Sequence, residues 1–122
     1  MQSAQSSIED IAKMLHFFAR ARRYSLLDRL ANSFSFEDVA AAIYDALREA
    51  QVALDSAEER EDPATGKKYK VVKVREETIP APYIPSRDKV EFFLELCKED
   101  LVYAKKAAAL ALAFPPLKEG GG

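Results

Sequence analysis

At residues 66–75 the sequence reads Gly-Lys-Lys-Tyr-Lys-Val-Val-Lys-Val-Arg, and this stretch decides the fold because it interrupts a chain that is otherwise patterned as helix. Its valines and tyrosine alternate with basic residues, which is the composition of a half-buried strand. A shift in the alternation between Val71 and Val72 indicates a bulge. Residues 76–79 are expected to form a returning strand, and three prolines between positions 80 and 85 restrict the sheet to a small edge hairpin.

Capping signals and apolar residues at helical spacing predict three helices before this stretch. Ser6-Ser-Ile-Glu9 is a capping box that opens the first helix, and serines open the second and third. The three predicted helices span about residues 7–23, 25–33 and 36–60. Pro63 ends the third helix, and Gly66 supplies the positive φ of a tight turn.

One more helix is predicted after the hairpin, over about residues 86–114, because Ser86 caps a continuous apolar stripe. The stripe consists of Val90, Phe93, Leu94, Cys97, Leu101, Ala104 and Ala108. These patterns predict a mainly α fold in a single domain, residues 1–122: a small helical bundle of about four helices, with a short β-hairpin insertion (strand-like residues about 67–79) between the third and last helices. Residues 118–122 are expected to form a flexible tail.

Composition excludes several classes of protein. The 122 residues are 48% hydrophobic and 31% charged, as in an ordinary globular domain, and we expect a cytoplasmic protein with no signal peptide and no membrane span. One cysteine, Cys97, and one histidine, His16, are too few for a Cys/His zinc site. Cys97 lies on an apolar stripe and is interpreted as a core residue. Because no catalytic motif occurs, we expect no enzymatic activity, no metal and no cofactor.

Charge is distributed unevenly along the chain, although its net value is only -2. Residues 1–35 carry five basic and three acidic side chains, residues 36–62 carry two and nine, and residues 67–75 carry five and none. The acidic cluster at residues 58–62 is interpreted as a solvated helix end, because it lacks the glycine-centred spacing of a calcium loop. Such an uneven distribution of charge can attract a polyanion to one face of the protein, or it can hold two proteins together through oppositely charged surfaces.

The basic strand is the first candidate nucleic-acid contact, because phosphates are neutralised by rows of Lys and Arg and bases stack on exposed aromatic rings. Its candidate residues are Lys67, Lys68, Tyr69, Lys70, Lys73 and Arg75. An alternative explanation remains open from sequence, since lysines also protect an edge strand from aggregation.

The first predicted helix carries the second candidate contact. Its basic candidates are Lys13, Arg20, Arg22 and Arg23. Lys13, Arg20 and Arg23 fall at helical spacing with His16, Phe17 and Tyr24, on the face opposite the apolar stripe, and Arg22 lies nearby. These basic residues either contact a nucleic-acid backbone or pair with the acidic third helix of the same or a neighbouring molecule.

Two segments carry a family resemblance: Tyr24-Ser-Leu-Leu-Asp-Arg-Leu-Ala-Asn-Ser-Phe34 and the following helix from Phe36 to Arg48. Over mainly residues 8–50 the chain resembles the small subunit of archaeal type I-A CRISPR surveillance complexes (Cascade). The resemblance implies a non-catalytic subunit present in several copies beside the repeated backbone subunits. It also implies contact with guide RNA, target DNA or the displaced single strand, with base pairing supplying sequence specificity.

The sequence thus leaves two functions open. The first is a small subunit of an RNA-guided antiviral DNA-targeting complex that supports guide-target duplex and displaced-strand binding through sequence-independent backbone contacts. The second is a helical protein-protein adaptor, which would use the basic first helix and the acidic third helix and make no nucleic-acid contact.

Overall fold

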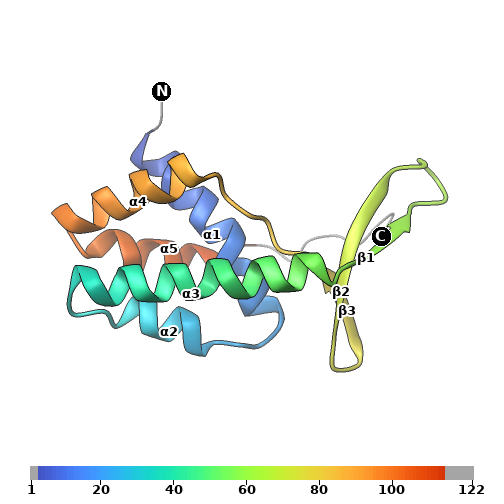
Figure 1. Ribbon diagram of the computed structural model, residues 1–122, viewed down its shortest axis with the longest axis horizontal. Coiled ribbons are helices and arrows are strands. Elements are labelled where there is room, and N and C mark those ends of the chain that lie inside the picture. Colours follow the sequence, from blue (N-terminus) through green and yellow to red (C-terminus); the bar gives the residue numbers. More distant parts are fainter. Residues whose placement is uncertain (1–2, 115–122) are drawn as a thin grey trace.

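The central element of the molecule is helix α1 (Ala4–Arg20), which packs against each of the four other helices found in residues 3–114, the part of the chain that this computed structural model describes (Figure 1). Those helices are α2 (Ser25–Ala31), α3 (Phe36–Asp55), α4 (Arg87–Glu99) and α5 (Val102–Ala113). A small sheet stands at one end of the bundle, between α3 and α4 in the sequence. The predicted class, mainly helical with a strand insertion before the later helices, is confirmed. The predicted flexible tail, residues 118–122, lies outside the described residues.

Helix α1 begins about one turn earlier than the capping box predicted, because the Ser3 hydroxyl accepts the Ser6 amide hydrogen at 3.1 Å. Its central position also buries most of its circumference. His16 is 9% exposed and Phe17 is 6% exposed, so the expectation that both lie on an open basic face is wrong. Phe17 instead packs edge-on against Phe18, with ring centroids 5.4 Å apart.

Helix α3 ends at Asp55, not near residue 60, and residues Glu58–Glu61 form strand β1. Carboxylates at a helix C-terminus are unfavourable, because they face the negative end of the helix dipole. In β1 two of these carboxylates, Glu59 and Glu61, lie opposite Lys70 and Lys68 of the next strand, where opposite charges across strands are stabilising. The acidic cluster is therefore a strand for most of its length, and its interpretation as a helix end is wrong.

The sheet has three antiparallel strands in the order β1-β2-β3, where β2 is Lys68–Val74 and β3 is Glu77–Pro80. The predicted hairpin with a returning strand is confirmed by the pairing of β2 with β3, but the expectation that β2 is an edge strand is wrong. It is the middle strand, because it pairs with β1 over its first four residues and with β3 over its last four. The register is uninterrupted on both sides, so the predicted bulge at Val71–Val72 is absent. The predicted turn at Gly66 is confirmed, with φ of +73° and the Gly66 amide donating to the Asp62 carbonyl at 2.8 Å.

The long last helix predicted from sequence is two helices, because the chain breaks at Asp100. Asp100 has an extended backbone, and its side chain accepts the Val102 amide hydrogen at 3.0 Å, which starts α5 in a new direction. Small residues then allow α5 to approach α1 closely: Ala104, Ala107, Ala108 and Ala111 are all buried. The described residues therefore contain five helices where about four were expected.

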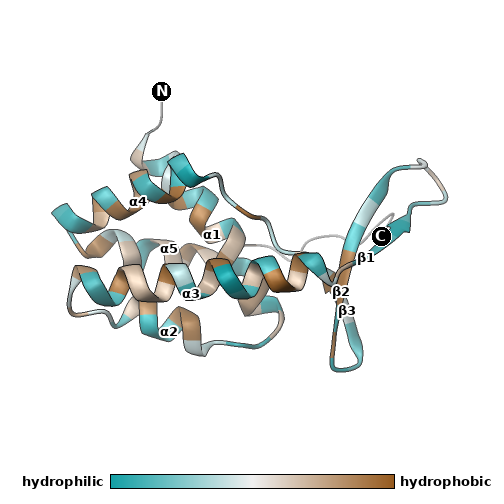
Figure 2. Cartoon of the chain, in the orientation of Figure 1, coloured by the Kyte–Doolittle hydropathy of each residue, from teal (hydrophilic) through white to brown (hydrophobic). Residues whose placement is uncertain are grey.

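The hydrophobic core lies among the helices, whereas the outer part of the sheet is polar (Figure 2). Cys97 is 1% exposed in this core, and burial raises the pKa of its thiol to about 12, which agrees with its interpretation as a core residue. Ile79 of β3 joins the core, and Val72 and Val74 of β2 pack against it. These three residues fix the sheet to the bundle. Among the described residues, no helix has both the length and the apolar character needed to cross a membrane.

Candidate nucleic-acid interface

The two basic clusters predicted from sequence meet where the sheet joins the bundle. Arg22 and Arg23 follow the end of α1, and Lys73 and Arg75 lie at the end of β2. Two adjoining hollows of about 390 and 520 Å³ separate these segments and have Ala21, Val74 and Arg75 in common. We call these two hollows the junction groove. Its basic lining residues are Arg20, Arg22, Arg23, Arg48, Lys73 and Arg75.

Three acidic side chains, Glu49, Glu76 and Glu77, also line the junction groove, so the six basic residues leave it with a net positive charge. Arg22 lies 3.4 Å from Glu77, and Arg23 pairs with Glu49. All four of these side chains are more than a third exposed, so each pair contributes at most about 1 kcal/mol to stability. A phosphate can therefore replace either glutamate at little cost.

Arg22 and Arg75 share an unusual backbone conformation. Their φ values are 59° and 57°, in the left-handed region that glycine normally occupies, and among the described residues no other non-glycine residue has a positive φ. Arg22 occupies the position after the α1 cap, where the Arg23 amide donates to Phe18 and the Arg22 amide to Ala19, which is a Schellman motif. Arginine thus stands where the backbone favours glycine, twice, on opposite sides of one groove.

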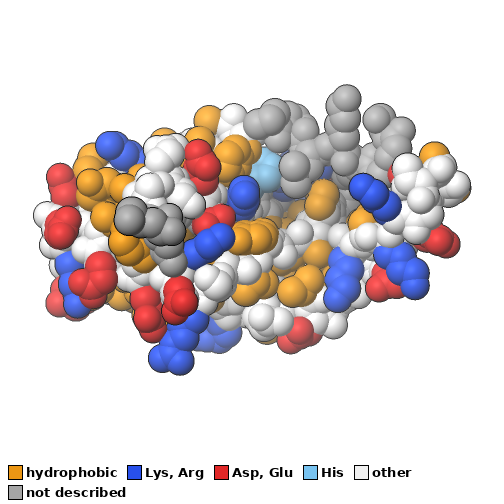
Figure 3. Space-filling view, turned by 90° about the horizontal axis from the view of Figure 1, so that it is seen from above, with side chains coloured by type: hydrophobic (Ala, Val, Ile, Leu, Met, Phe, Trp, Pro, Cys, Tyr) orange, Lys and Arg blue, Asp and Glu red, His pale blue; other side chains and the backbone are white. Residues whose placement is uncertain are grey.

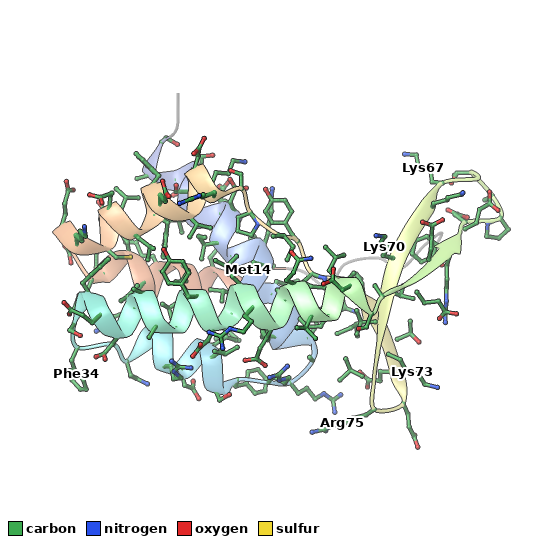
Figure 4. All side chains as sticks on the ribbon, viewed as in Figure 1. Met14, Phe34, Lys67, Lys70, Lys73 and Arg75 are labelled. Atoms are coloured by element: carbon green, nitrogen blue, oxygen red, sulfur yellow. The ribbon has the colours of Figure 1, made fainter. Side chains whose placement is uncertain are left out.

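The other strand lysines are not part of the junction groove. Figure 4 places Lys67 and Lys70 on the far arm of the sheet, and Lys73 and Arg75 toward the β2–β3 turn. Because β2 has no bulge, Lys68 and Lys70 lie on one face and Lys73 on the other. Lys68 is 3.6 Å from Glu59 of the acidic β1 strand. The basic strand is thus one cluster in the sequence but two in space, and its outer part faces carboxylates.

Tyr69 and Lys13, two further predicted contacts, are separated from the junction groove. Tyr69 is half-buried and lies opposite Arg60 of β1. Lys13 lies on α1 with its ammonium 5.6 Å from the ring centre of Tyr83 and 3.9 Å from Asp10. Figure 3 views a face of the molecule on which the histidine, in pale blue, has hydrophobic and basic side chains around it.

Sequence reasoning missed a buried carboxylate and one groove residue. Asp10 is 5% exposed, and its Oδ2 lies 2.8 Å from Nζ of Lys89 on α4. The hydrogen bond with Asp10 raises the pKa of Lys89 above its ordinary value. Arg48 of α3 lines the junction groove, yet it is far in sequence from both basic clusters. No local pattern distinguishes these residues from ordinary surface charges, because the lysine that pairs with Asp10 and the segments that face Arg48 across the groove belong to other elements.

No group of three or more His, Cys, Asp or Glu side chains that could hold a metal occurs among residues 3–114. No curated protein matches the sequence. The family model described as CRISPR-associated protein (Cas_Csa5) matches residues 14–114, which include the C-terminal part of α1, every later helix and the whole sheet. This chain therefore belongs to the CRISPR-associated Csa5 family.

Proposed function

We propose that this protein is the non-catalytic small subunit of an archaeal type I-A CRISPR effector complex, in which the junction groove holds the sugar-phosphate backbone of a nucleic-acid strand. Membership in the family supports a role in a CRISPR effector complex. The observation that carries the backbone contact is the convergence of Arg22 and Arg23 with Lys73 and Arg75, from two segments about 50 residues apart. Guide RNA, target DNA and the displaced strand all offer such a backbone.

The contact is expected to be independent of sequence, because cations that bind the backbone recognise phosphates, which every nucleotide carries. Arginine suits this role, since its planar guanidinium donates two parallel hydrogen bonds to a phosphate. The isolated protein should bind a single strand weakly, and several copies along one complex should bind it more tightly through effective concentration.

The adaptor without nucleic-acid contact is less well supported. It would use acidic α3 side chains, of which Glu49 and Asp45 already pair with Arg23 and Arg29 inside the same chain. Because such exposed pairs are weak, the family match, and not these pairs, favours the CRISPR subunit. A protein-contact surface is nevertheless present at the end of the bundle far from the sheet. There Phe34 is 92% exposed, which suits packing against another subunit of the complex (Figure 4).

The test is a charge reversal at the junction groove: Arg22→Glu, Lys73→Glu and Arg75→Glu in one chain. Binding to a labelled single strand of about 30 nucleotides is measured by fluorescence anisotropy over a range of salt concentrations. We expect at least a tenfold loss of affinity near 0.1 M salt, and a salt slope smaller by about 2, because each single-strand phosphate contact contributes about 0.7 to that slope.

The matched control reverses three exposed cations on the helices, Arg87, Lys98 and Lys105, which changes the net charge by the same amount. This control should keep most of the affinity, since screening limits distant charges to a reach of about 10 Å at 0.1 M salt. Equal losses in both variants would mean that net charge and not the groove governs binding. Unchanged binding in the junction variant would refute the backbone contact.

A further inference from the structure

A further hollow, separate from the two hollows of the junction groove, lies between α1 and the segment that follows β3. It has a volume of about 350 Å³, within the range of small-ligand pockets. We propose that this pocket, which we call the ring pocket, receives one unpaired nucleobase of the strand whose backbone lies in the junction groove. The inference rests on the proposed function and names a site that a backbone contact alone does not require.

The lining of the ring pocket suits a flat ring. Phe17, Tyr83 and Phe114 contribute aromatic side chains, and Pro80 and Pro82 contribute rigid apolar faces. Bases stack on aromatic side chains with little regard to sequence, because every base has a π face. Three aromatic rings and two prolines around one hollow are an unusually apolar lining for an exposed surface. They leave an apolar space that a base can fill.

Contacts with α1 side chains fix the position of Tyr83. Its hydroxyl donates to Asp10 at 3.5 Å, and the Lys13 ammonium lies 5.6 Å from its ring centre. Asp10 is itself held by Lys89 at 2.8 Å. The buried Asp10 carboxylate thus connects α1, α4 and the segment between β3 and α4 that carries Tyr83. These contacts keep the Tyr83 ring at the wall of the pocket. Fixing a ring before binding lowers the entropic cost of stacking on it.

The cations at the ring pocket suit a ligand that carries phosphates beside its flat ring. Lys13 and Arg20 line the ring pocket, and no acidic side chain is among its described lining residues. Arg20 also lines the junction groove, so the two hollows adjoin at this residue. A strand whose phosphates lie along the junction groove therefore passes the mouth of the ring pocket, where an unpaired base can turn inward.

His16, which lines the ring pocket, has one ring nitrogen without a hydrogen-bond partner. Its Nδ1 lies 3.0 Å from the Ala111 carbonyl oxygen, and because a carbonyl can only accept, Nδ1 carries the hydrogen of this bond. In the neutral ring Nε2 is then an acceptor, and it is buried with no hydrogen-bond partner. All four bases carry an N–H group on their pairing edge, so a base that reaches His16 can satisfy this nitrogen.

The test compares two labelled single strands of about 20 nucleotides, one with all its bases and one in which abasic sites replace them, by fluorescence anisotropy. We expect the wild-type protein to bind the intact strand about tenfold more tightly than the abasic one. Tyr83→Ala should remove this difference by weakening only the intact strand, and Tyr83→Phe should retain it. Tyr44→Ala, which removes a tyrosine of similar exposure on α3, should change neither affinity.

The outcomes separate this inference from the proposed function. Wild-type protein that binds neither strand would refute both, whereas equal binding of the two strands would refute the ring pocket alone. The inference also fails if Tyr83→Ala, folded by circular dichroism, weakens both strands equally or neither, or if Tyr69→Ala removes the difference instead. A free nucleoside monophosphate could also bind at micromolar concentration, with an affinity that the junction charge reversal leaves unchanged. This result would show that the ring pocket binds a soluble nucleotide, and it would refute the proposal that the pocket receives a base of the bound strand.

Discussion

Replacing Arg22 by glycine and by alanine should separate the backbone role of this position from its charge. Both variants remove the guanidinium and its exposed pair with Glu77. They differ in the backbone, because only alanine keeps a Cβ atom in a residue whose φ is 59°. The pair of variants therefore measures the conformational strain at the end of α1 with the charge held constant.

The magnitude follows from opposing effects. A side chain in the left-handed region costs about 1–2 kcal/mol, and glycine avoids this cost. Glycine loses about 0.5–1 kcal/mol more than alanine when the unfolded chain is ordered. We expect Arg22→Gly to be more stable than Arg22→Ala by about 0.5–1 kcal/mol, which corresponds to a few degrees in the unfolding midpoint of a domain of this size.

Urea unfolding followed by circular dichroism measures the difference in the free energy of unfolding between the two variants. Single-strand binding by the same two proteins should weaken equally, since both lack the same charge. An alanine variant as stable as the glycine variant would contradict the strain assigned to the Schellman position. Unequal affinities would show that backbone shape, and not only charge, matters to binding.

Gly66→Ala should destabilise the β1–β2 hairpin by about 1 kcal/mol. Backbone strain alone causes this loss, because φ is +73° and the added Cβ would meet no atom closer than 3.9 Å. Hydrogen exchange of the β1 and β2 amides measures the loss, and unchanged protection would contradict the prediction. Cys97 should resist Ellman's reagent near pH 8, because raising the thiol pKa from 9.0 to about 12 lowers the thiolate fraction about 1,000-fold; rapid labelling without urea would show that the thiol is accessible. Asp45→Asn should slightly lower the unfolding temperature at neutral pH, because a hydrogen bond from Arg29 lowers the Asp45 pKa below 3.8. A carboxylate with a lowered pKa stabilises the fold above its unfolded pKa and loses this contribution as pH falls through the folded pKa. Wild type and variant should therefore converge once the pH lies well below 3.8, and a difference that persists there would contradict the assignment.

Local chemistry in the sequence determined the starts of α3 and α4 and the turn at Gly66. The Ser35 hydroxyl accepts the Asp38 amide hydrogen at 3.2 Å and starts α3 where its sequence predicts, and the same holds for Ser86 at α4. Gly66 has the positive φ expected of it. These features are predictable because capping and turn formation involve partners within about four residues. The apolar stripe of α4 likewise predicted the burial of Cys97.

Only the tertiary structure decided which surfaces remain open and which charges meet. His16 and Phe17 have the spacing of a polar face but are buried, because α1 is surrounded by the other four helices. Residues 58–61 have the pattern of a helix end but form a strand, because pairing with the lysines of β2 outweighs local helix propensity.

The basic residues show the same division. Composition identified residues 66–75 as the unusual segment, and it is a strand. Its charges are nevertheless divided: the outer lysines face acidic β1, while Lys73 and Arg75 meet Arg22 and Arg23 across the junction groove. Strand register and packing join residues far apart in the chain, so no sequence window contains them together. The sequence supplied the charges, and long-range packing of Ile79, Val72 and Val74 on the bundle placed them.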